Sequence, residues 1–177
     1  MELILINSLI AKRSPANAFE IGTFDGRTTL NLAINMEANA TIYTLDLPPR
    51  ENQETAFAIT GDKKFIPNET RRLRFLESEE KQKIKILYGD SASFDFSPYH
   101  GKIDFIFVDG AHTYEYVMND SKRALEMASP NAIIIWHDYG TWEGVTKALN
   151  ELYQNNPQYK NLRSIEETTL ALLTHTL

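Results

Sequence analysis

The chain has 177 residues, no cysteine, and a formal net charge of −6 from 18 lysines and arginines against 24 aspartates and glutamates. This length fits one domain, and 42% hydrophobic with 24% charged residues is ordinary for a globular protein, which excludes disorder and fibrous repeats. The lack of cysteine excludes disulfides, a thiolate nucleophile and sulfur-based zinc sites. Because no basic face offsets the acidic excess, nucleic-acid binding is not expected.

The N-terminal segment MELILINSLIAKRSP has a short apolar stretch, but an acidic residue precedes that stretch and no small-residue cleavage site follows it. It does not fit a signal peptide. No apolar run in the chain approaches the roughly 18 to 20 residues that a membrane span requires. We therefore expect a cytoplasmic protein with no membrane partner.

Five short apolar segments bounded by turn residues predict strands that are covered on both faces. They are residues 18–21, 41–45, 84–88, 103–108 and 132–136. The stretches between them predict helices, which cover residues 28–37, 114–127 and 144–154. Strands that alternate with helices predict crossover connections, a parallel sheet and an α/β fold.

The last residues break this alternation. Residues 160–166 and 169–176 are strand-like runs joined by a short turn at Glu167 and Thr168, which predicts an antiparallel hairpin strand at the end of the sheet. Laid out in this way, the seven strands and their crossovers use almost the whole of residues 1–177 as a single domain.

Residues 48–82 form the other irregular region. Turn-forming pairs and mixed charge predict a long loop or short helical pieces over residues 48–68, and a helix over residues 71–83. Long loops in compact domains are commonly lids or binding segments, although a merely solvated insertion is the alternative. We expect residues 48–82 to be a variable insert that acts as a lid or binds the acceptor.

The first strand runs into a glycine-bounded turn, Glu20-Ile21-Gly22-Thr23-Phe24-Asp25-Gly26, and then into a helix. Ligands of open parallel sheets bind at such strand ends, where free backbone amides suit an anionic group. The dinucleotide pattern G-x-G-x-x-G fails here, because Phe24 and Arg27 stand where its second and third glycines would be. The turn instead resembles motif I of class I S-adenosylmethionine-dependent methyltransferases.

This resemblance implies a cofactor on the first three strand ends. Gly22 and Gly26 would let the backbone approach the amino-acid tail, and Glu20 would lie near its ammonium group. Asp46, about 20 residues beyond the turn, would bond the ribose hydroxyls. Asp90 would accept a hydrogen bond from the adenine amino group. The expected cofactor-binding residues are Glu20, Gly22, Thr23, Phe24, Gly26, Thr28, Asp46, Leu47, Gly89, Asp90, Ser91 and Asp109. Ordinary turn glycines, and helix capping by Thr28, are the alternatives.

The fourth and fifth strands end in Val108-Asp109-Gly110-Ala111-His112 and Trp136-His137-Asp138-Tyr139. Together with the terminal hairpin, these ends resemble a branch of small methyltransferases related to sugar and macrolide O-methyltransferases and to cephalosporin-hydroxylase-like proteins. The resemblance implies a Rossmann-like, doubly wound sheet of seven strands, mostly parallel, with an antiparallel C-terminal hairpin strand.

Metal-dependent members of the wider group hold a divalent cation with acids at these two strand ends. The implied metal ligands here are Asp109, His137 and Asp138, with magnesium or manganese as the cation. Asp109, His112 and His137 are the candidate catalytic residues. His112 could be a general base or a structural support for the helix at residue 114, and His137 has the same alternatives. Tyr139 and Trp142 could line the acceptor pocket or pack in the core.

The expected function is transfer of a methyl group from S-adenosylmethionine to a hydroxyl oxygen of a small molecule or sugar, assisted by a divalent metal. A homodimer is expected as the assembly. Two alternatives stay open, an NAD(P)-dependent oxidoreductase and a non-catalytic cofactor-binding or interaction protein.

Overall fold

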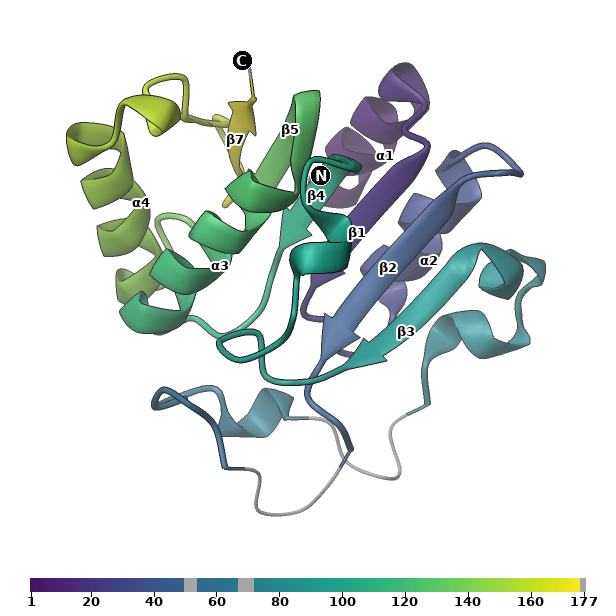
Figure 1. Ribbon diagram of the computed structural model, residues 1–177, viewed down its shortest axis with the longest axis horizontal. Coiled ribbons are helices and arrows are strands. Elements are labelled where there is room, and N and C mark those ends of the chain that lie inside the picture. Colours follow the sequence, from purple (N-terminus) through teal and green to yellow (C-terminus); the bar gives the residue numbers. More distant parts are fainter. Residues whose placement is uncertain (50–53, 67–71, 176–177) are drawn as a thin grey trace.

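A single seven-stranded sheet organises the molecule in the computed structural model, which describes residues 1–49, 54–66 and 72–175. Its strand order is β3-β2-β1-β4-β5-β7-β6 (Figure 1). Strands β1 to β5 pair in parallel, β7 runs antiparallel to β5, and β6 runs antiparallel to β7. The strands are β1 (Asn17–Ile21), β2 (Thr41–Asp46), β3 (Ile84–Tyr88), β4 (Ile103–Val108), β5 (Ala128–Trp136), β6 (Arg163–Ser164) and β7 (Ala171–Thr174). The predicted fold class is confirmed.

Helices cover both faces of this sheet (Figure 1). On one face, α1 (Glu2–Arg13) and α2 (Arg27–Asn35) share a core with the central strands. On the other face, α3 (Tyr114–Met127) and α4 (Glu143–Asn155) share a second core. No helix in the described part of the chain has the length and apolar character needed to cross a membrane.

Strand β4 shows why the middle of the sheet is stable. Successive side chains of a strand point to opposite faces, and Ile106 and Val108 enter the α3–α4 core while Phe105 and Phe107 enter the α1–α2 core. All four side chains are buried, which is the pattern expected of a parallel strand between two helical layers.

The direction of the chain across the sheet reverses at β1. The chain moves from β1 to β2 and β3 on one side, and then crosses over to β4 and β5 on the other. In open parallel sheets, such a switch point leaves a crevice at the carboxyl ends of the strands, because the loops on either side turn away from each other. The fold therefore predicts a ligand site between the ends of β1 and β4.

Two parts of the sequence-based interpretation need correction. The helix predicted for residues 71–83 is wrong, because the described part forms two 3-10 helices, Arg74–Glu77 and Glu79–Lys83, separated by Ser78 in an extended conformation. The N-terminal segment, to which no element was assigned, is α1. The terminal hairpin is present but short, with positive φ at Glu167 in its turn, and Thr176 lies outside the described residues.

Candidate functional site

A cavity of about 370 Å³ lies at the switch point. The ends of all five parallel strands line it, together with residues from the segment 54–66, which lies beyond the arrowheads of β2 and β3 in Figure 1. Most of the residues predicted from the sequence are brought together here: Gly22, Phe24, Asp46, Leu47, Gly89, Asp90, Ser91, Asp109, His112, His137 and Asp138. Residues chosen because they follow predicted strands thus line one continuous pocket.

Four residues predicted to bind the cofactor do not line this cavity. Thr23 is buried and shares a hydrogen bond of 2.6 Å with the Thr44 hydroxyl. Gly26 precedes α2 and lies against the Phe75 ring, and Thr28 belongs to the first turn of α2. The side chain of Glu20, the fourth, lies between the sheet and α2, where Thr29 bonds to it. Any contact of these four with a ligand stays a prediction.

Glu20 is fully buried on β1. The hydroxyls of Thr29 and Thr44 both donate to its Oε2, whereas Oε1 has no hydrogen-bond partner in the described part of the chain. Burial raises the pKa of Glu20 to about 8, although the two hydroxyls oppose the shift. Asp109 and Asp46 add to the rise because they are negative charges nearby. Glu20 is therefore a buried acid directly below the pocket.

Gly22 permits the close approach of β1 and β4 at the pocket floor. Its φ is +98°, a conformation that side chains disfavour, and a Cβ atom at this position would lie 2.0 Å from the main-chain oxygen of Asp109. Only glycine fits here without moving one of the strands. The identity of Gly22 therefore sets the position of the Asp109 backbone.

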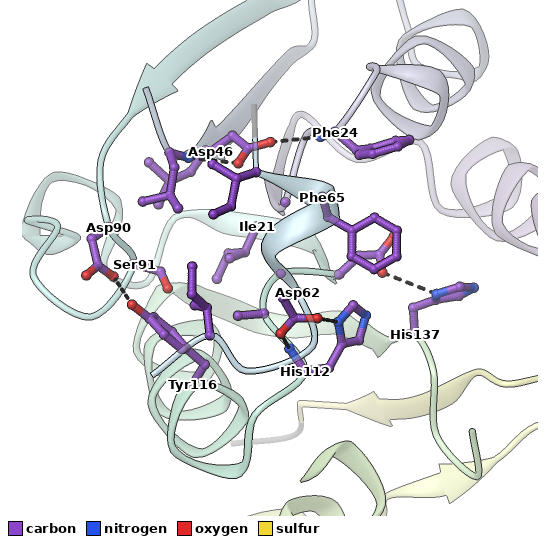
Figure 2. Close-up of a pocket in the computed structure, with 18 of the residues that line it drawn as sticks. Ile21, Phe24, Asp46, Asp62, Phe65, Asp90, Ser91, His112, Tyr116 and His137 are labelled. Atoms are coloured by element: carbon purple, nitrogen blue, oxygen red, sulfur yellow. Dashed lines mark hydrogen bonds and ion pairs between the residues drawn. The ribbon is translucent and has the colours of Figure 1, made fainter. Parts of the chain in front are cut away.

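Asp46 is held by main-chain donors at the end of β2. The Phe24 amide donates to its Oδ2 at 2.8 Å, and the Leu47 amide donates to its Oδ1 at 2.8 Å (Figure 2). The first of these bonds ties the end of β2 to the turn after β1. Asp46 is thus fixed at the rim of the cavity, where the resemblance implies a carboxylate that accepts hydrogen bonds from the ribose hydroxyls.

Asp90 occupies the corresponding place after β3. The Tyr116 hydroxyl donates to its Oδ1 at 2.9 Å, as Figure 2 shows, and the Ala92 amide does so at the same distance. The Ala56 amide donates to its Oδ2 at 2.7 Å. The carboxylate predicted to receive the adenine amino group therefore also binds the segment 54–66. Tyr116 was not predicted, because nothing in the sequence pairs it with Asp90.

Asp109, His137 and Asp138 form a half-buried cluster at the ends of β4 and β5. One potential ligand atom from each residue lies within 4.8 Å of the other two. His137 Nδ1 is 3.2 Å from Asp109 Oδ1 and 3.2 Å from Asp138 Oδ2. This nitrogen is buried, and no described residue meets it with the angular geometry of a hydrogen bond. The three predicted metal ligands thus point toward one another.

Charge is concentrated in this cluster. Burial raises the pKa of Asp109, and the nearby imidazole of His137 opposes the rise. Burial alone would lower the pKa of His137, but the carboxylates of Asp109 and Asp138 outweigh it and raise that pKa to about 11. The two imidazoles in turn hold the pKa of Asp138 well below its ordinary value, despite burial. Two acids around a histidine nitrogen form a donor set suited to a divalent cation.

His112, in the loop between β4 and α3, is held between two acids. Its Nδ1 is 2.6 Å from Asp62 Oδ1, its Nε2 is 2.8 Å from Asp138 Oδ2, and its amide donates to Asp62 Oδ2 at 2.9 Å. Burial alone would lower its pKa, but the two carboxylates raise it to about 9. Since both ring nitrogens face carboxylate oxygens, which only accept, the ring is held in its protonated form, and His112 can accept a substrate proton only after it has lost one of its own.

Asp62 is another pocket residue that the sequence analysis did not identify. It follows Gly61 in the irregular region, 50 residues before His112. Figure 2 shows the Asp62 carboxylate directly against the His112 ring, with Phe65 beside them. No local pattern could have paired the two residues, since the contact depends on how the segment 54–66 lies over the strand ends.

Trp142 lines the cavity, and its contact with the acceptor stays a prediction. Its ring stacks on His112 with 4.3 Å between centroids and an interplanar angle of 16°. Tyr139 does not line this cavity, and its hydroxyl donates to Asn150 at 2.9 Å. Trp142 therefore shields the His112 ring from solvent, while Tyr139 packs beside α4.

Residues 19–139, more than half of the chain, match the model of a family described as a methyltransferase domain. The chain belongs to this family. The assignment to methyltransferases is thereby confirmed, and the oxidoreductase alternative loses its support. No curated protein shows significant similarity in sequence to the chain.

Solved methyltransferases share the fold at low sequence identity. The O-methyltransferase TomG of Streptomyces achromogenes, in complex with SAM, has a TM-score of 0.72 and 17% identity over 99% of this chain and 80% of that one. SAH-bound methyltransferase PaMTH1 of Podospora anserina has a TM-score of 0.73 and 16% identity over 99% and 78%. An O-methyltransferase of Bacillus cereus with SAH has a TM-score of 0.70 and 15% identity over 98% and 80%.

Proposed function

We propose that this methyltransferase transfers a methyl group from S-adenosylmethionine to a hydroxyl oxygen of a small molecule or sugar. The observation that carries the proposal is the cluster of Asp109, His137 and Asp138, which opens into the same cavity as the predicted cofactor residues. The structural relatives described as O-methyltransferases, crystallised with SAM or SAH, support both the donor and the kind of acceptor atom.

The ends of β1, β2 and β3 have the features that the donor requires. Gly22 leaves backbone exposed to the cavity, and Asp46 and Asp90 provide carboxylates at the two positions expected for ribose and adenine. The cavity volume lies within the range of roughly 300 to 1,000 Å³ that is usual for small-molecule sites. The sulfonium donor is already activated, so the contribution of the protein is to align the reacting atoms and exclude water.

A divalent cation fits the cluster of Asp109, His137 and Asp138. The buried Nδ1 of His137 lacks a hydrogen bond among the described residues and faces both carboxylates, as a ligand nitrogen would. Two oxygens and one nitrogen suit manganese somewhat better than magnesium. Bound there, a cation would lower the pKa of an acceptor hydroxyl and so supply a better nucleophile.

His112 lies outside the cluster of Asp109, His137 and Asp138 but contacts one of its members. Its Nε2 bonds to Asp138, and its Nδ1 bonds to Asp62 on the segment over the pocket. We infer that His112 orients Asp138 while the acceptor binds, and that it takes the acceptor proton only after it has lost one of its own and has parted from Asp62 or Asp138. The general-base role predicted from the sequence therefore requires a neutral His112 with one ring nitrogen released from its carboxylate.

The insert 48–82 provides the lid or acceptor-binding segment in this proposal. Its described part closes over the pocket through Asp62 on His112 and through the edge-to-face contact of Phe65 with Phe24, 5.8 Å between centroids. Residues 50–53 and 67–71 lie outside the described residues. The homodimer and the cytoplasmic location stay predictions.

Ligand binding and transfer test the proposal together. Thermal unfolding is measured with S-adenosylmethionine, S-adenosylhomocysteine, NAD⁺ and NADP⁺, and methyl transfer to a panel of sugars, glycosides and catechols is followed with and without Mn²⁺ or Mg²⁺. We expect stabilisation by the first two ligands only, and transfer that needs the cation. Stabilisation without transfer to any hydroxyl would favour the non-catalytic alternative, and no stabilisation would contradict the choice of donor.

A further inference from the structure

Helix α1 brings an acidic side chain to the reaction site. Ile6 and Ile10 are completely buried on the sheet face that also buries Phe107 and Ile135. Residues four apart share one face of a helix, so Glu2 continues the buried row by one turn toward the strand ends. The packing of α1 therefore fixes where the Glu2 carboxylate lies.

Both oxygens of Glu2 are engaged. Its Oε1 accepts hydrogen bonds from the Thr169 amide at 2.6 Å and from the Thr169 hydroxyl at 2.9 Å. Its Oε2 lies 3.1 Å from His137 Nε2. Because two donors from Thr169 hold one oxygen, the other cannot rotate away from the imidazole.

Thr169 also binds the backbone of the neighbouring acid. The Asp138 amide donates to the Thr169 hydroxyl oxygen at 3.3 Å, and the Tyr139 amide donates to the Thr169 carbonyl at 2.9 Å. Asp138 has a φ of +65°, which is uncommon for a residue with a side chain and needs support from its surroundings. Glu2 is thus connected to His137 directly and to Asp138 through Thr169.

We propose that Glu2 is a positioning residue for the cation site, which accepts the Nε2 proton of His137 so that the lone pair of Nδ1 faces Asp109 and Asp138. This inference rests on the proposed function, because it assigns Glu2 to the cation site proposed there. Histidines that bind metals commonly donate their other N–H to a carboxylate, which fixes both the tautomer and the ring orientation.

The geometry favours this role over a purely structural ion pair. Glu2 contacts Nε2, on the side of the ring opposite to the Nδ1 that faces the two acids, which is where the carboxylate partner of a metal-bound histidine lies. Loss of a partner of this kind typically lowers metal affinity about 10- to 100-fold. A surface pair between groups as exposed as these would contribute little to stability.

The Glu2→Gln variant tests the tautomer directly. If the two Thr169 donors continue to bind the side-chain oxygen of residue 2, the new NH₂ group faces His137 Nε2. His137 Nε2 must then accept a hydrogen bond from the NH₂ group, and the imidazole proton moves to Nδ1. We expect Mn²⁺ affinity, measured by calorimetry, to fall about 10- to 100-fold, and S-adenosylhomocysteine affinity to stay unchanged. In Mg²⁺-loaded protein, imidazole ¹⁵N spectra should lose the signal of protonated Nε2 at His137.

Glu37→Gln is the matched control, because it removes the same charge from an exposed position after α2. A second variant, Thr169→Val, removes one donor to Glu2 but keeps the amide, and should weaken Mn²⁺ binding less than Glu2→Gln does. Should Glu2→Gln unfold, Thr169→Val and the ¹⁵N spectrum of the parent protein still decide the question.

The outcomes separate this inference from the proposed function. Parental Mn²⁺ affinity in both Glu2→Gln and Thr169→Val, or a His137 protonated on Nδ1 in the Mg²⁺-loaded parent, would overturn the role of Glu2 and leave the proposed reaction standing. A parent that binds no divalent cation would also overturn the inference, whereas its binding of S-adenosylhomocysteine and its methyl transfer test the reaction separately.

Discussion

The two sides of the pocket differ in how their acids are held. On the cofactor side, at the ends of β1 to β3, main-chain amides bind Asp46 at both oxygens and take part in binding Asp90. On the reaction side, at the ends of β4 and β5, Asp109 and Asp138 instead meet the half-buried side chain of His137. The first arrangement depends on backbone that many sequences could supply, and the second depends on three particular side chains.

This difference separates binding from chemistry in the chain. A site held by main-chain donors keeps its shape when one side chain changes, whereas a cluster of oppositely charged side chains keeps its shape only while each partner is present. Substitutions on the reaction side should therefore remove activity without removing the cofactor. Substitutions on the cofactor side should instead weaken cofactor binding and leave cation binding unchanged.

The largest effect is expected from Asp109→Ala, which removes one acid of the cluster and keeps the backbone contact of residue 109 with β1. Methyl transfer should fall by at least about 100-fold, equivalent to about 3 kcal/mol of transition-state stabilisation, and Mn²⁺ binding should be lost. Calorimetry with S-adenosylhomocysteine should give the parental affinity. An equal loss of cofactor affinity would contradict the separation of the two sides.

Gly22→Ala should break the junction between the two sides. The new Cβ would lie 2.0 Å from the Asp109 carbonyl oxygen, in a backbone conformation with φ of +98°. We expect the free energy of unfolding in urea to fall by about 3 kcal/mol, from strain and overpacking together.

Gly101→Ala is the control for this variant. Gly101 has a φ of +68° but nothing within 4 Å of an added Cβ, so it reports strain alone. Its cost should be about 1 kcal/mol. Equal costs at the two positions would mean that the approach of β1 to β4 does not depend on Gly22.

Asp46→Asn should weaken the cofactor side alone. One of the two amides that bind Asp46 would then face an NH₂ group, and the negative charge beside the expected ribose would be lost. We expect S-adenosylhomocysteine affinity to fall about tenfold, or about 1.4 kcal/mol, with no change in Mn²⁺ affinity. A loss of Mn²⁺ affinity in this variant would show that the two sides are coupled.

Glu20→Gln should change the pH dependence of stability. Burial raises the pKa of Glu20 from 4.5 to about 8, and the negative charges of Asp109 and Asp46 add to the rise. Between these pH values the unfolded chain releases a proton that the folded chain retains, so the free energy of unfolding falls as pH rises.

The Glu20→Gln variant should lose this slope between pH 5 and 8, as measured by urea unfolding at several pH values. It should also be more stable than the parent at pH 8. A slope as steep as that of the parent would mean that Glu20 is ionised in the folded protein at neutral pH.

Local patterns predicted the sheet and most of the pocket. Apolar runs and turn residues gave the five parallel strands, and α3 begins and ends at the predicted residues 114 and 127. The strand ends then predicted Asp46, Asp90, Asp109 and the His137–Asp138 pair, because parallel strands bring their carboxyl ends to one edge.

Contacts between distant segments could not be predicted in this way. Asp62 meets His112 across 50 residues, and Glu2 meets His137 across 135 residues. Neither contact can be predicted from residue spacing along the sequence, because each depends on how a loop or a helix packs on the folded sheet. The apolar residues at positions 6 and 10 could have predicted the helix α1, but they could not have identified His137 as the partner of Glu2.

The bond between Glu2 and Thr169 spans 167 residues, nearly the whole chain. Contacts of such long sequence separation form late in folding, because a large loop must close before they contribute any stability. A chain still under synthesis therefore cannot complete its reaction side until residue 169 has emerged and β7 has paired with β5. Local opening of this strand would release Thr169 from Glu2, so a bound cation should slow hydrogen exchange at the β7 amides.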